Sequence, residues 1–234
     1  MTARIFHTGD SPAVLFETLA DAVAARLSAA IASRGHASFV ACGGTTPGDL
    51  YDVLSQRALS WEKVTVTLSD ERWVEPSSDR SNEHLVRARL LTGRAGVASF
   101  VALKTGHARA VEAETEVHER IAAIARPFDV VLLGMGNDGH TASLIPGAAG
   151  LARALDASDP ALARAIVPPP ETGMGERMSL TLRALLDSAA IFLLIRGDDK
   201  RAAYDRAGSG SDIREVPVRG VLLQDAVPVE TFWA

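Results

Sequence analysis

The sequence lacks several features on which secreted and membrane proteins depend. It has a single cysteine, Cys42, among its 234 residues. This excludes an internal disulfide framework and favours a reducing compartment. No uninterrupted stretch of about 18 apolar residues is present, which argues against a transmembrane helix. The first residues also lack an apolar run of signal-peptide length. We therefore expect a cytoplasmic protein with no membrane partner.

Aromatic side chains and positive charge are scarce as well. Aromatic residues make up 5% of the chain, so the core must be built mainly from Ala, Val, Leu and Ile. The formal net charge is −5, which disfavours nonspecific nucleic-acid binding because such binding needs a basic face. A local group of arginines can still hold a small anion on an acidic protein.

What is present is typical of a globular protein, with 47% hydrophobic and 23% charged residues. The length suits one α/β domain, so we predict a single domain over residues 1–234 and a monomer. Short β-rich runs at residues 38–41, 64–68, 128–133 and 191–195 alternate with helical patterns. The helices are expected at residues 12–33, 82–91, 107–125 and 181–189, with another from Asp198. This order predicts an α/β fold with a mainly parallel sheet and helices on both faces.

The carboxyl ends of such strands are where α/β proteins bind ligands. After the first predicted strand come Gly43, Gly44, Thr45 and Thr46, followed by a helix that begins near Pro47. The glycines let a ligand approach the backbone, and the hydroxyls with the free N–H groups of the helix start form an anion cradle. A tight turn with a threonine helix cap explains the same residues equally well.

The next strand is followed by Asp70, Glu71 and Arg72. Three charged side chains at a strand end would lie over the crevice, where Asp70 can hold a water or hydroxyl and Arg72 can pair with an anion. A solvated ion-pair turn is the alternative. Two further basic residues, Arg177 and Lys200, follow a Pro/Gly-rich loop and the strand at residues 191–195.

The most informative segment follows the strand at residues 128–133 and reads GMGNDGHTASL. Its glycines satisfy the dinucleotide-binding pattern G-x-G-x-x-G, but no second strand ending in an acidic residue follows about 20 residues later, so we do not expect a nucleotide. Asn137, Asp138 and His140 lie together where we expect a helix to begin. A histidine at such a place suits a general base, and either Asp70 or Asp138 is able to orient it.

Six blocks occur in order along the chain: GGTTP, SDERWV, SNEHL, LLGMGNDGHTASLIPG, RMSLTL and GDDKR. Together they resemble the 6-phosphogluconolactonases of the glucosamine-6-phosphate isomerase/6-phosphogluconolactonase family, over nearly the whole chain. The resemblance implies a modified Rossmann-like fold without metal or organic cofactor. It also implies hydrolysis of 6-phospho-D-glucono-1,5-lactone to 6-phosphogluconate in the oxidative pentose phosphate pathway.

The resemblance further implies roles for residues of this chain. His140 is the base, and Asp70 and Arg72 line the lactone site. The turn Gly43, Gly44, Thr45 and Thr46 grips the phosphate with Arg177 and Lys200. Asn137 completes the set of residues that we expect to bind substrate.

Two other classes resemble this sequence less well. Glucosamine-6-phosphate deaminases carry a glutamate a few residues after the histidine, whereas this chain has no acidic residue between His140 and Pro146. Noncatalytic sugar-phosphate sensors usually add a helix-turn-helix, and this chain has no basic recognition helix.

Overall fold

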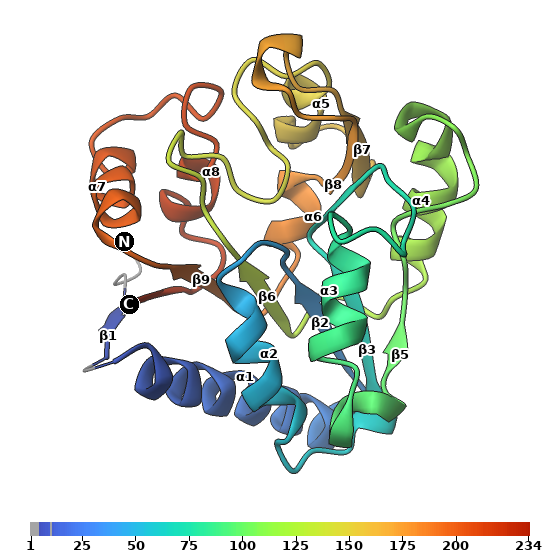
Figure 1. Cartoon of the computed structure of the whole chain (residues 1–234), viewed down its shortest axis with the longest axis vertical. Helices are drawn as coiled ribbons and strands as arrows, with labels where there is room; N and C mark the ends of the chain where they lie inside the picture. Colours follow the sequence, from blue (N-terminus) through green and yellow to red (C-terminus); the bar gives the residue numbers. More distant parts are fainter. Residues whose placement is uncertain (1–4, 10) are drawn as a thin grey trace.

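The protein is described by a computed structural model, which covers residues 5–9 and 11–234. A seven-stranded sheet in the order β1-β10-β9-β6-β2-β3-β5 forms its centre, and every pair of neighbouring strands is parallel. The central strands β2, β6 and β9 are buried at every position, so both faces of the sheet are covered. This confirms the α/β fold with a mainly parallel, Rossmann-like sheet. Figure 1 shows the C-terminus beside β1, because β1 pairs with β10.

The strands of this sheet have the following bounds: β1 Ile5–Thr8, β2 Ala37–Ala41, β3 Val64–Leu68, β5 Ser99–Phe100, β6 Val130–Leu133, β9 Ile191–Ile195 and β10 Val229–Trp233. The α-helices are α1 Pro12–Arg34, α2 Pro47–Ser55, α3 Asn82–Arg89, α4 Glu114–Ala122, α5 Leu151–Leu155, α6 Leu182–Leu186, α7 Asp198–Ala207 and α8 Arg219–Leu222. Short 3₁₀ turns lie at Trp61–Lys63, Gly93–Val97, Ala110–Ala113 and Pro170–Thr172.

Helix α1 shows how local sequence places an element. Ser11 caps it by accepting a hydrogen bond from the N–H of Val14, and Pro12 occupies its first turn, where a missing N–H is harmless. Gly35 ends it in the left-handed conformation at φ 81°. The apolar side chains that recur every four residues are buried and contact β2, β6 and β10. The helix therefore runs along the sheet (Figure 1).

A second sheet was not predicted. Strands β4 (Asp70–Arg72), β8 (Arg177–Leu180) and β7 (Ala163–Ile166) form a three-stranded sheet in the order β4-β8-β7, with antiparallel pairing throughout. The charged segment after β3, for which a solvated ion-pair turn was the alternative interpretation, is thus a short strand. Its pairing with β8 brings residues about a hundred positions apart next to each other.

Several predicted helix bounds were wrong. The helix expected at residues 107–125 is a 3₁₀ turn followed by α4, and that expected at 181–189 shortens to α6. No helix begins near His140, since residues 134–150 form turns and isolated bridges before α5. Gly139 and Gly147 adopt positive φ in this stretch, which interrupts helical geometry.

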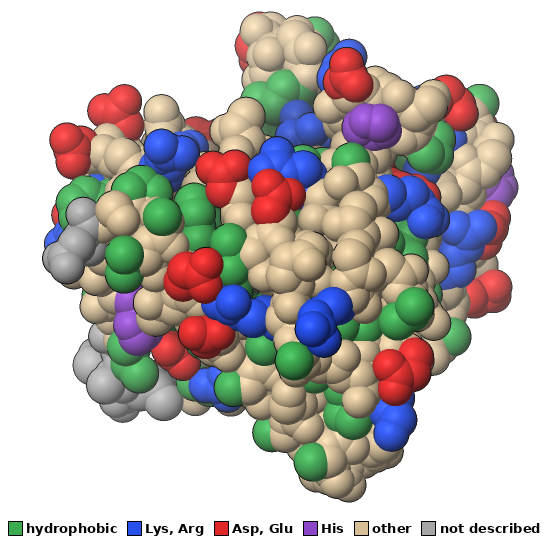
Figure 2. Space-filling model, turned by 60° about the horizontal axis from the view of Figure 1, so that its bottom comes forward, with side chains coloured by type: hydrophobic (Ala, Val, Ile, Leu, Met, Phe, Trp, Pro, Cys, Tyr) green, Lys and Arg blue, Asp and Glu red, His purple; other side chains and the backbone are tan. Residues whose placement is uncertain are grey.

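The surface in Figure 2 carries acidic and basic side chains side by side rather than one continuous basic area. Within residues 5–9 and 11–234, no helix combines the length and the apolar character that crossing a membrane requires.

Candidate active site

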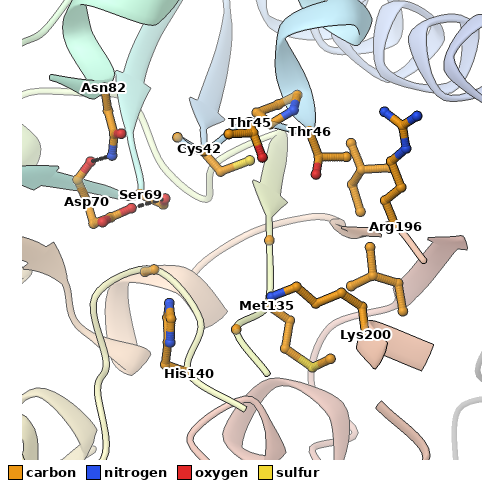
Figure 3. A pocket seen from close by; sticks show the side chains of 18 of the residues that line it. Cys42, Thr45, Thr46, Ser69, Asp70, Asn82, Met135, His140, Arg196 and Lys200 are labelled. Atoms are coloured by element: carbon orange, nitrogen blue, oxygen red, sulfur yellow. Dashed lines mark hydrogen bonds between the residues drawn. The ribbon is translucent and has the colours of Figure 1, made fainter. Parts of the chain in front are cut away.

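A cleft of about 210 Å³ lies at the carboxyl ends of the parallel strands. Four segments that follow β2, β3, β6 and β9 meet there, as the topology of a parallel sheet requires. The lining residues are Cys42, Gly43, Gly44, Thr45, Thr46, Pro47, Ser69, Asp70, Arg72, Asn82, Gly134, Met135, Gly136, His140, Ala142, Arg177, Leu194, Ile195, Arg196 and Lys200. Figure 3 shows His140 and Lys200 extending into the cleft from different sides.

The turn after β2 forms one wall. Gly44 has φ 105°, a conformation open mainly to glycine. A Cβ atom on Gly43 would lie 1.8 Å from Oδ1 of Asn82, so only glycine fits against α3 there. Thr46 occupies the position before α2, yet its side chain makes no capping hydrogen bond. Its hydroxyl is therefore available to a ligand, which favours the anion cradle over the helix cap.

Asp70 follows the neighbouring strand β3, beside this turn, and is 6% exposed. Its Oδ1 accepts a hydrogen bond from the Ser69 hydroxyl at 3.0 Å, and its Oδ2 accepts one from the Ser143 hydroxyl at 2.6 Å. The amide nitrogen of Asn82 donates to the Asp70 carbonyl at 2.8 Å. These bonds fix the carboxylate at the edge of the cleft and leave its remaining lone pairs for substrate hydroxyls or water.

Glu71 does not lie over the crevice as its neighbours do. Its buried carboxylate accepts hydrogen bonds from the backbone N–H groups of Arg72, Asn82 and Glu83 and from the Ser81 hydroxyl, at 2.7–2.9 Å. Burial raises the pKa of Glu71, although all four hydrogen bonds oppose that rise. The carboxylate caps the start of α3 and so ties β4 to that helix, holding Asp70 and Arg72 at the cleft.

Arg72 and Arg177 are directly opposite each other in the β4–β8 pair. Arg72 donates to the Arg80 carbonyl at 2.7 Å, and Nη1 of Arg177 lies 3.5 Å from the Ser143 hydroxyl. The Nε atoms of both arginines are buried without a hydrogen-bond partner. Burial lowers the pKa of Arg177; Asp70 opposes this, while Arg72 and Arg80 add to it. Two neighbouring guanidinium groups that line the cleft form a place where an anion is favoured.

His140 belongs to the turn after β6. Its Nδ1 lies 2.6 Å from Oδ1 of Asp138, which also accepts the His140 backbone N–H at 3.1 Å. Burial acts to raise the pKa of Asp138, but the hydrogen bonds and charge of His140 outweigh it and lower that pKa to about 2. An ionised carboxylate only accepts, so Nδ1 carries the proton and Nε2 is left as a base. A Cβ on Gly136 would lie 2.2 Å from Nδ1, so this glycine makes room for the ring.

Lys200, on the first turn of α7, and Arg196, directly after β9, line the remaining side. Figure 3 shows Arg196 near Thr46 and the Lys200 ammonium reaching toward the centre of the cleft. The cleft thus has a second pair of cations in addition to Arg72 and Arg177.

Nearly all of the predicted site residues meet in this cleft, with one exception. Asn137 is exposed and does not line it, and its carbonyl accepts a hydrogen bond from Arg206. Asn82 and Arg196 were missed. Arg196 follows the carboxyl end of β9 directly, so the rule that singled out Lys200 also applies to it. Asn82 follows no strand end, and its only sequence signal is its place in the block SNEHL. Across the described residues, no three His, Cys, Asp or Glu side chains form a group suited to a metal ion.

Comparison with known proteins identifies the family of the chain. The family model for glucosamine-6-phosphate isomerases/6-phosphogluconolactonase matches residues 10–233. The chain is 43% identical to a protein named 6-phosphogluconolactonase from Rhizobium meliloti (strain 1021), over 97% of both chains. It is 40% identical to one from Caulobacter vibrioides, over 94% of this chain and 93% of the relative. A crystal structure of a 6-phosphogluconolactonase from Shewanella baltica OS155 superposes with a TM-score of 0.96 at 41% identity, covering 99% of this chain and 97% of the other.

Proposed function

Because the chain belongs to the glucosamine-6-phosphate isomerase/6-phosphogluconolactonase family, we propose that it hydrolyses 6-phospho-D-glucono-1,5-lactone to 6-phosphogluconate, with His140 as general base. The observation that carries this proposal is the His140–Asp138 contact at 2.6 Å, which leaves Nε2 free at a cleft lined with cations. The reaction serves the oxidative pentose phosphate pathway.

His140 Nε2 takes a proton from a water molecule as the water oxygen bonds to C1 of the lactone. The carbonyl electrons move to the exocyclic oxygen, which Arg72 or backbone N–H groups of the glycine turns stabilise. When the bond between C1 and the ring oxygen breaks, the imidazolium returns its proton to that oxygen, which becomes a hydroxyl. Asp138 keeps the imidazole in the productive tautomer and stabilises the imidazolium. Asp70 holds a sugar hydroxyl or the attacking water.

The phosphate is held at a distance from C1. The Gly43, Gly44, Thr45 and Thr46 turn forms its cradle, with Lys200 and Arg177 as its counter-charges. Binding energy gained there positions C1 against His140.

A deaminase activity is less well supported, because aldose ring opening would use an acid that is missing between His140 and Pro146. The curated relatives reported above carry the lactonase name. We also propose that residues 1–234 act as one domain and that the protein is a cytoplasmic monomer.

The test is a lactonase assay corrected for spontaneous hydrolysis. We expect the purified protein to hydrolyse 6-phosphogluconolactone and to release no ammonia from glucosamine 6-phosphate. His140→Ala should lower kcat by roughly 10²–10⁴, the range for loss of a general base, with the fold intact. His140→Asn should be nearly as inactive, because an amide cannot take the proton. Ammonia release at a rate comparable to lactone hydrolysis, or wild-type turnover by His140→Ala, would reject the assignment.

A further inference from the structure

The turn that carries His140 is supported from outside by a segment near the C-terminus. The N–H of Val218 donates to the Gly139 carbonyl at 2.9 Å. If Gly139 carried a Cβ atom, the nearest atoms to it would all belong to Val216, with Cγ1 only 2.4 Å away. Because glycine has no Cβ, the backbone of Gly139 itself lies against the Val216 side chain, and its φ of 79° also favours glycine. Figure 1 shows α8 next to the loop that follows β6.

This supporting segment, residues 208–218, begins with a GSGS sequence that is typical of a flexible loop. In the structure, however, hydrogen bonds from Arg219 hold this segment in place. Its Nε donates to the Ala207 carbonyl, and its Nη1 donates to the Asp212 carbonyl and the Glu215 carboxylate, each at 3.1 Å. Arg219 is only 7% exposed, and a buried cation must keep its partners. The arginine therefore binds both ends of the segment.

We propose that Val216 is a positioning residue for His140, held in that role by Arg219. The inference rests on the proposed function of His140 as base. Hydrogen bonds within the turn, from Gly136 N–H to the His140 carbonyl at 2.8 Å and from Gly139 N–H to the Gly136 carbonyl at 3.0 Å, define its shape. The contact with Val216 fixes the position of the whole turn relative to the cleft. A shift of Gly139 moves the next residue, His140, away from C1 of the substrate.

The test is Val216→Ala, which removes the Cγ1 methyl group that rests on Gly139. We expect kcat to fall about 10- to 100-fold, the scale of a small misplacement of a catalytic group. The KM for the phosphorylated lactone should change by less than about twofold, since no substrate contact is removed. Val216→Thr keeps the shape of the side chain and should keep the wild-type kcat.

Ile213→Ala is the matched control. Ile213 lies in the same segment, is half-buried like Val216, and packs against the core. It is not among the nearest neighbours of Gly139. We expect a similar loss of thermal stability with the wild-type kcat. Equal falls in kcat for both variants would mean that the segment acts only through general stability, and the proposal would be wrong.

Arg219→Lys offers a second, independent variant. A lysine keeps the charge but lacks the guanidinium group that donates to three acceptors. The segment that carries Val216 is then held less firmly, so kcat should fall with little change in KM. His140→Asn is measured in the same assay. If it is inactive while Val216→Ala and Arg219→Lys turn over at the wild-type rate, the positioning role is overturned and the proposed base stands. Wild-type turnover by His140→Asn would instead overturn the proposed function itself.

Discussion

Arg72 and Arg177 face each other across the antiparallel pair of β4 and β8, each with a buried Nε that has no hydrogen-bond partner. Like charges directly opposite each other destabilise a sheet unless something lies between them. Asp70 neutralises part of this charge, but both of its oxygens already accept hydrogen bonds from the hydroxyls of Ser69 and Ser143. The pair is therefore arranged for an anionic substrate, and Lys200 and Arg196 line the same cleft.

The proposed phosphate site predicts different effects on the KM values of a phosphorylated and an unphosphorylated lactone. Arg177→Ala and Lys200→Ala should each raise KM for 6-phosphogluconolactone roughly 10- to 100-fold, the effect of losing one charge-assisted hydrogen bond. The KM for unphosphorylated gluconolactone should change much less, because that substrate has no phosphate for these residues to bind. Steady-state kinetics on both lactones checks this. Arg196→Ala should act in the same direction.

Arg201→Ala is the control for Lys200. Arg201 is the next residue on α7, but it pairs with Asp205 and lies over the rings of Phe6 and Trp233. Its removal lowers the net charge by the same amount without touching the cleft, so both KM values should stay at wild type. Equal losses on the two lactones for Arg177→Ala or Lys200→Ala would show that these residues do not bind the phosphate.

The sequence was sufficient to predict four adjacent strands of the main sheet and most of the cleft, because both follow from local patterns, but not β5 or β10. Buried runs mark β2, β3, β6 and β9, and their carboxyl ends must meet in a parallel sheet. The residues that follow those strand ends could therefore be placed in one cleft, although several helix bounds were wrong. Arg177 follows the Pro/Gly-rich loop as expected, and it is also the first residue of β8, which was not predicted.

The second sheet and the direction of individual side chains depend on tertiary contacts. Strand β4 has three residues and pairs with a segment far along the chain, so no periodicity reveals it. Glu71 looked equivalent to Asp70 and Arg72, but the N–H groups at the start of α3 draw it away from the cleft. Asn137 points to solvent because the turn at Gly136 and Gly139 directs His140 inward instead. The choice between Asp70 and Asp138 as the partner of His140 likewise required atomic positions.

Asp138 predicts a particular pH dependence. Its pKa is lowered to about 2, so it stays ionised over the whole range in which the enzyme would be assayed. A fall in kcat at mildly acidic pH thus reports protonation of a group other than Asp138. If that group contacts Asp138, the acid limb of the kcat profile moves to lower pH in Asp138→Asn, because a neutral amide does not stabilise a neighbouring positive charge.

The same variant should also lower kcat at neutral pH, by up to about 10⁴, because an amide can donate to Nδ1 and favour the wrong tautomer. The lowered pKa of Asp138 also makes the folding stability depend on pH. A carboxyl with a lowered pKa contributes stability above its unfolded value of 3.8, and this contribution is lost as the pH falls toward 2. Wild-type kcat and an unmoved acid limb in Asp138→Asn would show that Asp138 does not act on His140.

Cys42 gives a prediction that does not depend on the reaction. It lines the cleft but is only 4% exposed. Burial raises the pKa of its thiol to about 12, although a hydrogen bond with Tyr51 opposes the rise. The thiolate is the reactive form, so at pH 8 iodoacetamide should alkylate the native protein far more slowly than the protein unfolded in guanidinium. Cys42 is the sole cysteine of the chain, so mass spectrometry of the intact protein reports this residue alone. Alkylation of the native protein at the unfolded rate would mean that the floor of the cleft opens to solvent, and the closed packing of the turn after β2 against Tyr51 would be wrong.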